Sequence, residues 1–454
     1  MFKNKNCKCK PLASLLRRMF AGIHCSNHQY QGNSNDEDQM KPYALLSLSI
    51  GLCGWMMAVT HADEKPKMPI NDLKAVAHGN NAFAFDLYAK LGKAPKNLFY
   101  SPSSLSTALA MCYGGARGST AQEMAKVLHF SMAQNQLHPA IARLSQLLTT
   151  PSKPSLYQLS IANALWLQQD AKLEDAYVES MKQNYGAGIQ LVDYKTKAEQ
   201  ARLTINQWVE ERTQNKIKDL IKPGMLDAEM RLVLTNAIYF LGDWASPFEK
   251  DATYAQDFHL ASGKMMQTDM MHQTSHMLYM ENDQVQVLEK DYRGSDLSMV
   301  MILPKKQGAL TDIERQWNVK QYDEWLSQLR LTRIALSLPK FTMNTEYELS
   351  KVLPEMGMPL AFSNQADFSG MSTSEPFKIG FVIHKAFVKV DEKGTEAAAA
   401  TAIGMRLAGA PIMEKPIEFT ADHPFIVILR DKRTGTILFM GRVMEPSAAV
   451  AKGK

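Results

Sequence analysis

The stretch Asp391–Pro411 most constrains what this chain can fold into, because its local preference contradicts its side-chain pattern. It reads DEKGTEAAAATAIGMRLAGAP and lies between two apolar runs typical of strands, Ile379–Val390 and Phe425–Leu429. Five of the six residues after Glu396 are alanine, which favours a helix over a strand. A segment with such a conflict is a candidate conformational switch, and a surface loop with an accidental alternation is the other interpretation.

Alternate residues of this stretch separate into two faces, as the two-residue period of a strand requires. One face would carry Thr395, Ala397, Ala399, Thr401, Ile403, Met405 and Leu407. The other would carry Glu396, Ala398, Ala400, Ala402, Gly404, Arg406 and Ala408. Small side chains near the start would let the segment slide between two strands, and Gly394 supplies a hinge without a Cβ atom.

The run GTEAAAATA, preceded by VIHKAFVKVDEK, resembles the hinge of the serpin family, the serine protease inhibitors. Further motifs fit the same family in order: NLFYSPSSLSTALAM, GDW, FTADHPFIVIL and LFMGRVMEP. The resemblance extends from about Ile70 to Pro446 and is that of a secreted, bacterial-type member. It implies an α+β fold with three β-sheets, eight to nine helices and an exposed reactive-centre loop over about 391–411.

The resemblance also implies which residues of the loop act. The hinge would comprise Glu392, Gly394, Thr395, Glu396, Ala397, Ala398, Ala399, Ala400 and Thr401. In the family the residue that gives the acyl group usually lies fourteen positions beyond the hinge glycine, so the reactive bond is expected at Ala408–Gly409. A small residue there suits an elastase-like protease. Leu407 or Arg406 is the alternate if the count shifts, which would indicate a chymotrypsin-like or a trypsin-like target.

The resemblance implies that five residues outside the loop control how the main sheet opens: Ser101, Ser104, Asn236, Trp244 and His384. Asn236 carries the amide side chain of the buried run LVLTNAIYF, and this amide must be hydrogen-bonded or it would cost about 1–3 kcal/mol. In the family an asparagine at this place bonds the histidine of the IHKA strand, here His384. Ser101 and Ser104 are also candidate helix caps, with Pro102 in the first helical turn.

The first 62 residues predict a leader. Residues 40–62 resemble a secretory signal: Lys41, an apolar run and the small-x-small site Thr60-His61-Ala62, with cleavage expected before Asp63. Residues 1–39 are a doubtful extension, and 63–454 would be a single serpin domain. We expect a secreted, extracellular or periplasmic protein with no stable membrane span after processing; a signal anchor is the alternative if translation begins at Met1.

Composition excludes several function classes. The leader holds most of the net charge of +5, which leaves a nearly neutral body and no indication of nucleic-acid binding. Four of the five cysteines lie in the leader, and Cys112 is expected to be a small buried side chain. His272 and His276 stand four apart, but Met270–Met280 predicts a strand without a third ligand nearby. We therefore expect no metal and no cofactor.

An enzyme would need a catalytic motif, and no nucleophile elbow, zinc-protease motif or dinucleotide fingerprint is present in the sequence. The predicted function is irreversible suicide-substrate inhibition of serine, or alternatively cysteine, endopeptidases by a monomer that could also form loop–sheet polymers. The competing hypothesis is a non-inhibitory serpin that acts as a binding, chaperone or storage protein. One further element is predicted: an amphipathic helix over Ala201–Ile221, with apolar residues on one face.

Overall fold

The computed structural model describes residues 70–153, 156–186, 188–395 and 415–446, all within one unit, Pro66–Lys454. These residues form nine α-helices: α1 (Ile70–Leu91), α2 (Pro102–Gly115), α3 (Gly118–Val127), α4 (Gln134–Thr149), α5 (Asp175–Tyr185), α6 (Tyr194–Arg212), α7 (Leu310–Gln316), α8 (Val319–Gln328) and α9 (Val352–Met356). The expected α+β class and helix number are confirmed in this part of the chain.

A six-stranded sheet carries the hinge. Its strands lie in the order β10 (Phe341–Glu348), β11 (Phe381–Val390), β12 (Gly394–Thr395), β4 (Leu232–Asp243), β2 (Tyr157–Gln168) and β3 (Ile189–Val192). A nine-stranded sheet has the order β1 (Leu98–Tyr100), β15 (Ile437–Val443), β14 (Phe425–Asp431), β8 (Leu297–Pro304), β7 (Val285–Asp291), β6 (Met265–Glu281), β9 (Arg330–Pro339) and β13 (Ile417–Thr420), with β5 (Thr253–His259) on β6.

Hydrogen bonding thus joins the described strands into two sheets, where three were expected. The cause is the length of β6, which has 17 residues. Its first part pairs with β5, its last residues pair with β7, and β9 pairs along most of its length. One long strand therefore links two groups of strands that would otherwise count as separate sheets.

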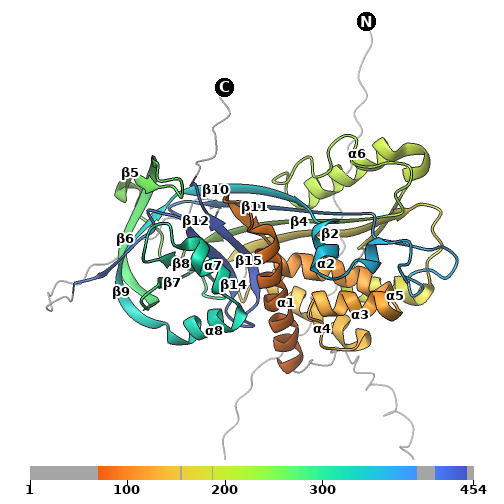
Figure 1. The fold of residues 1–454 in the computed structure, drawn as a ribbon, viewed down its shortest axis with the longest axis horizontal. Helices are drawn as coiled ribbons and strands as arrows, with labels where there is room; N and C mark the ends of the chain where they lie inside the picture. Colours follow the sequence, from red (N-terminus) through yellow and green to blue (C-terminus); the bar gives the residue numbers. More distant parts are fainter. Residues whose placement is uncertain (1–69, 154–155, 187, 396–414, 447–454) are drawn as a thin grey trace, which may run out of the picture. The chain divides into compact units, whose positions relative to one another are not determined.

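The six-stranded sheet is buried on both faces. Successive side chains of β4 point to opposite sides, as strand geometry requires. Leu234 and Ile238 join the large core, whereas Val233 and Ala237 join a second core with residues of α6. Figure 1 shows α2 on one side of β4 and β2, and α6 on the other. A strand added to this sheet would accordingly meet two packed interiors.

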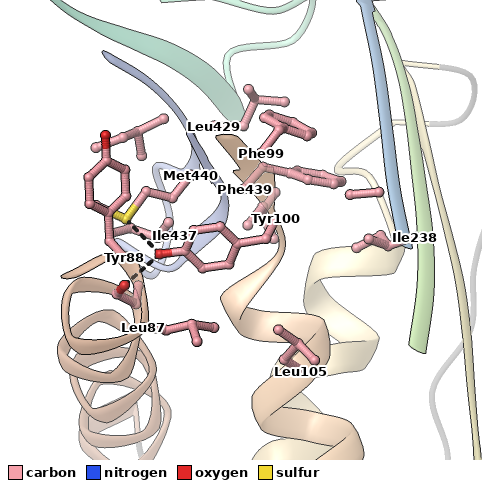
Figure 2. Close-up of a cluster of buried hydrophobic side chains, with 14 of the residues drawn as sticks. Leu87, Tyr88, Phe99, Tyr100, Leu105, Ile238, Leu429, Ile437, Phe439 and Met440 are labelled. Carbon is pink, nitrogen blue, oxygen red and sulfur yellow. Dashed lines mark hydrogen bonds between the residues drawn. The ribbon is translucent and has the colours of Figure 1, made fainter. Parts of the chain in front are cut away.

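The large core fixes α2 beneath the sheet (Figure 2). Leu105 of α2 lies in the same buried cluster as Leu87 of α1, Ile238 of β4 and Phe439 of β15. The hydroxyl of Tyr100, just before α2, donates a hydrogen bond of 2.5 Å to the carbonyl of Ala84. These contacts hold the first turn of α2, and with it Ser101 and Ser104, against β4 and β11.

The helix predicted over Ala201–Ile221 was wrong at both ends, and α6 begins earlier, at Tyr194. The helix stops at Arg212, because Gln214 and Asn215 adopt positive φ angles of 53° and 59°. Ile217 and Leu220 nevertheless pack in the same core as α6. The apolar pattern therefore predicted correctly that this segment is buried, but it predicted the wrong backbone conformation after Arg212.

No helix within the described ranges is long and apolar enough to cross a membrane, and the candidate signal lies outside them.

Candidate functional site

The start of the predicted loop is already a strand of the main sheet. In β12, Gly394 pairs with Asp243 and Thr395 with Gly242 of β4, both antiparallel, and Thr395 also pairs with Val390 of β11. Beyond this point β4 and β11 pair directly with each other as a parallel ladder, from Tyr239↔Phe387 to Val233↔Phe381. We call this ladder the seam. Along the seam, β4 and β11 are hydrogen-bonded to each other. At the hinge end, β12 lies between them.

Gly394 fits the sheet because it has no side chain. A Cβ atom built on Gly394 would lie 2.1 Å from the carbonyl oxygen of Gly242 and 2.7 Å from the Cα of Asp243. Both are backbone atoms of a central strand and cannot easily move aside. The close approach of two backbones explains why glycine stands where the hinge begins.

Thr395 is fully buried and its hydroxyl lies 2.7 Å from that of Tyr292. The Tyr292 ring stacks on Trp244, with ring centroids 4.5 Å apart and an interplanar angle of 17°. Burial holds the pKa of Tyr292 well above its ordinary value, so the phenol stays neutral and able to share a hydrogen bond with the threonine. The buried Thr395 side chain is thus held by a hydrogen bond to Tyr292, whose ring stacks on that of Trp244.

The turn before β12 is held by backbone hydrogen bonds. The Trp244 amide donates to the carbonyl of Lys393 at 2.8 Å, and its indole Nε1 donates to the carbonyl of Asp391 at 3.1 Å. The amide of Phe248 donates to the carbonyl of Glu392 at 2.8 Å. Trp244 therefore lies where the predicted hinge enters the sheet.

An ion pair adds to this anchor. Lys340 Nζ lies 3.1 Å from Glu392 Oε1, and the Glu392 carboxylate is 12% exposed. Burial acts to raise the pKa of Glu392, but hydrogen bonds to the carboxylate and the charge of Lys340 outweigh it, so the pKa is below its ordinary value. Glu392 is therefore ionised at neutral pH and ties the hinge to the β9–β10 connection.

A second polar cluster lies under the middle of the seam. His384 of β11 and Asn236 of β4 face each other across the ladder, and His384 Nδ1 bonds Asn236 Oδ1. Asn236 Nδ2 donates to Ser104 Oγ at 2.6 Å and to Asn163 Oδ1. The amide of Ser101 donates to His384 Nε2 at 3.1 Å. The bond expected between Asn236 and His384 is present.

This bonding pattern defines the state of His384. Because Nε2 accepts from the Ser101 amide, the ring proton lies on Nδ1 and is donated to Asn236. Burial lowers the pKa of His384 to about 3, so the ring is neutral. The two strands of the seam are thereby joined by a side-chain bond whose donor and acceptor are both uncharged.

The structure describes only part of the predicted site. Gly394, Thr395 and Glu392 lie together at the open end of the seam, and Asn236, His384, Ser101 and Ser104 lie together under its middle. Ser101 caps α2 as expected, by accepting from the Ser104 amide at 3.3 Å. Ser104 itself caps nothing and bonds Asn163 instead. The remaining predicted residues lie outside the described ranges: Glu396, Ala397, Ala398, Ala399, Ala400, Thr401, Arg406, Leu407, Ala408 and Gly409.

Three residues of the site were not predicted. Asn163 could have been found, since it is a polar residue within a strand-like apolar run, YQLSIANALWL, as Asn236 is in its own run. Tyr292 and Lys340 carry no such signal. Elsewhere, Cys112 is buried and burial raises its pKa to about 12, as expected for a packing residue. His272 and His276 lie on strand β6, as their run predicts.

The chain is similar to known proteins over most of its length. A profile of the family Serpin (serine protease inhibitor) matches residues 78–446. An uncharacterized serpin-like protein of Thermococcus kodakarensis is 42% identical over 374 residues, which cover 82% of this chain and 86% of the relative. A leukocyte elastase inhibitor of Xenopus laevis is 38% identical over 373 residues, covering 80% of this chain and 97% of the relative.

Solved structures agree with the sequence comparison. The crystal structure of uncleaved ovalbumin superposes with a TM-score of 0.76 at 30% sequence identity, covering 82% of this chain and all of ovalbumin. The family profile, the relatives, the fold and the hinge geometry point to one conclusion: this chain belongs to the serpin family.

Proposed function

We propose that this protein is an irreversible suicide-substrate inhibitor of serine endopeptidases. A protease attacks the loop at Ala408–Gly409 and becomes acylated through its own serine. The freed arm then inserts between β4 and β11, carrying the acylated enzyme with it. The observation that carries the proposal is the position of β12, which lies between two strands that are otherwise paired with each other.

The register of β12 supports insertion of the arm. Continued antiparallel from Thr395↔Gly242 and Thr395↔Val390, the arm would oppose Ala397 to Phe240 and Val388. Ile403 would likewise oppose Leu234 and Val382. These four partners belong to the large core. The loop face that begins with Thr395 would therefore meet the large core, although the two patterns come from different parts of the chain.

Thr401 would meet the polar cluster. In the same register it opposes Asn236 on one side and His384 on the other. Insertion must break the bond between these two side chains, and the threonine hydroxyl can both donate and accept in its place. A polar residue at this position of an otherwise apolar face is what the interior of the seam requires.

The length of β4 defines how far the arm can travel. The last opposed residue is Met405, opposite Leu232, so about eleven residues from Thr395 would span roughly 36 Å. Ala408 would then lie just past the far end of the sheet. One parallel ladder would be replaced by two antiparallel ladders, which are slightly more stable per residue. Burial of Ile403 and Met405 would add about 1.5–3 kcal/mol each.

The experiment is a protease panel. Elastase-, chymotrypsin-, trypsin- and subtilisin-like enzymes are incubated with the protein, and we expect an SDS-stable complex with at least one, the elastase-like enzyme favoured. Mass spectrometry of the released fragment should show a first residue of Gly409. A fragment starting at Ala408 or Leu407 would move the reactive bond to Leu407 or Arg406.

Thr395→Arg is the control variant, because an arginine cannot occupy the fully buried position beside Tyr292. It should still be cut and should form no complex.

The cut wild-type protein should melt at least ~10 °C above the uncut protein. Insertion adds many stabilising contacts, and each kcal/mol of added stability raises the melting temperature by ~2–4 °C. Cutting without complex and without this shift would instead favour a non-inhibitory binding or storage role.

We also propose export, with the signal at 40–62 removed before Asp63. Terminal sequencing of the mature protein tests this directly, and a first residue far from Asp63 would contradict it.

A further inference from the structure

A short segment after β4 holds the turn that leads into the hinge. We call residues 244–248 the anchor segment. Within it, Trp244 and Phe248 together donate hydrogen bonds of 2.8–3.1 Å to three successive carbonyls, those of residues 391–393. The position of the turn before β12 therefore depends on where the anchor segment lies.

A buried lysine contacts the same segment. Lys290 of β7 is 3% exposed, and its Nζ donates to the carbonyl of Ser246 at 2.8 Å. The same Nζ lies 5.3 Å from the centre of the Trp244 ring and 4.7 Å from that of the Phe248 ring. The two residues whose amides hold the turn are thus the two whose rings lie against this amine.

Gln273 of β6 completes the support. Its Oε1 accepts from Lys290 Nζ at 2.6 Å, and its Nε2 donates to the hydroxyl of Ser246 at 2.9 Å and to the carbonyl of Pro247 at 2.8 Å. The ladder between β6 and β7 ends at Leu278↔Glu289. Past that pair, the bond between Lys290 and Gln273 joins the two strands and fixes the anchor segment to both.

This support uses a residue that is costly to bury. Neither acceptor of Lys290 carries a charge, and burying an ammonium group on uncharged partners lowers stability. Burial lowers the pKa of Lys290 to about 7, but a neutral amine still has two N–H groups, so both bonds can form in either state. A side chain that lowers the stability of the fold is expected where it serves the function.

We propose, on the basis of the proposed function, that Lys290 is a positioning residue for insertion of the arm. Lys290 holds the anchor segment, the anchor segment holds the turn before β12, and the turn places Thr395 between β4 and β11, where insertion would start. With a loose anchor segment the freed arm would insert more slowly. Water would then hydrolyse the acyl ester first more often, and the protease would leave active.

The first measurement is the number of inhibitor molecules consumed for each protease molecule trapped, with the full-length protein. Lys290→Met keeps a side chain of similar length and removes both hydrogen bonds. We expect the number to rise at least ~3-fold over wild type, because two hydrogen bonds that hold the segment are lost. An unchanged number would overturn the proposal.

Two controls separate positioning from general stability and from charge. Leu128→Ala removes a fully buried side chain after α3 and should lower the melting temperature by ~4 °C or more without changing the number consumed. Lys432→Met removes a lysine that pairs with Asp291 at 2.7 Å and should also leave the number unchanged. A rise in either control as large as that of Lys290→Met would overturn the proposal.

The second measurement is hydrogen exchange of the uncut protein, followed by mass spectrometry, and it does not depend on inhibition. Local opening of the anchor segment exposes the amides of Trp244 and Phe248. Lys290→Met should therefore speed exchange in residues 244–248 at least ~5-fold and leave residues 232–240 of β4 unchanged. Unchanged exchange in the anchor segment would overturn the role of Lys290, whether or not a protease is trapped. Faster exchange in a protein whose wild type traps no protease would refute the proposed function and support the hold of Lys290 on the hinge.

Discussion

His384 accepts the hydrogen bond from the Ser101 amide only while the ring is neutral, because protonation occupies Nε2. Its pKa is about 3 in the folded protein and near 6.5 in an unfolded chain. Between these values the unfolded chain binds a proton that the folded protein does not, so the free energy of unfolding falls as pH falls. From pH 6 to pH 4 this single group should remove roughly 2–3 kcal/mol.

We predict that His384→Gln unfolds with a shallower pH dependence over this range, although it is less stable at pH 7. The measurement is urea denaturation between pH 4 and pH 7. His129→Gln is the control, because the His129 side chain is 38% exposed and lies outside the seam. If His384→Gln and wild type lost stability in parallel between pH 6 and pH 4, the neutral state of His384 would be wrong.

The hydroxyls of Thr395 and Tyr292 form a pair that can be measured. Thr395→Val keeps the shape of the side chain and removes its hydrogen bond, which should cost about 1 kcal/mol of unfolding free energy. Because Tyr292→Phe removes the same bond from the other side, the double variant should lose less than the sum of the two losses. Strict additivity in urea denaturation would show that the hydroxyls do not interact.

Single polar residues in apolar runs were the part of the site that could be predicted. Asn236 had to find a partner inside the protein, and the resemblance indicated His384. Tyr292 and Lys340 could not be predicted, since Tyr292 lies 103 positions from Thr395 in the sequence and a tyrosine between Asp291 and Arg293 carries no sign of its partner. Only the paired sheet brings these side chains together.

Among the elements, β12 is the shortest and depends most on one residue. In Gly394→Ala the added Cβ would overlap the backbone of Gly242, so the hinge must leave its position between β4 and β11. We predict a loss in the rate of protease-complex formation on the order of tenfold, because a backbone overlap costs ~1–3 kcal/mol. The rate is measured by complex formation over time on SDS gels.

Gly263→Ala is the matched control for this change. Gly263 has a positive φ of 81°, but a Cβ atom there meets nothing within 4 Å. It should cost about 1 kcal/mol in stability and leave the rate of complex formation unchanged. Equal effects of the two substitutions would mean that the close contact at Gly394 has no special role.

The elements also show where sequence patterns fail. Apolar runs predicted β4 and β11 well, because both strands are buried along nearly their whole length. The helix over Ala201–Ile221 was predicted too long, since apolar spacing reports which residues are buried and not where the backbone turns. The positive φ angles of Gln214 and Asn215 end the helix at a point that hydrophobic spacing does not mark.

For the molecule as a whole, the proposed register makes one position in the arm decisive. Thr401→Arg should leave the uncut protein as stable as wild type and abolish most of the rise in melting temperature on cutting, because arginine would lie between Asn236 and His384. Ala410→Arg is the control and should keep the rise, because Ala410 follows the proposed Ala408–Gly409 bond and is not part of the arm that inserts. The comparison is made by calorimetry of cut and uncut samples.

A full rise in melting temperature with Thr401→Arg would refute the register. That outcome would leave the family assignment intact, because the family rests on the comparison with known proteins and on the fold.

The number of sheets could not be predicted from the sequence, since a single strand, β6, decides whether two groups of strands join.

The seam also gives the uncut protein a limited working life. The ladder from Phe381 to Phe387 and the polar cluster beneath it join β4 and β11 directly in the uncut protein. If that ladder opens thermally, the uncut arm would insert between β4 and β11, and the molecule would no longer be able to inhibit a protease. Such openings quicken about 3–6-fold per 10 °C, so a warmed stock should lose inhibitory titre long before it loses its folded appearance.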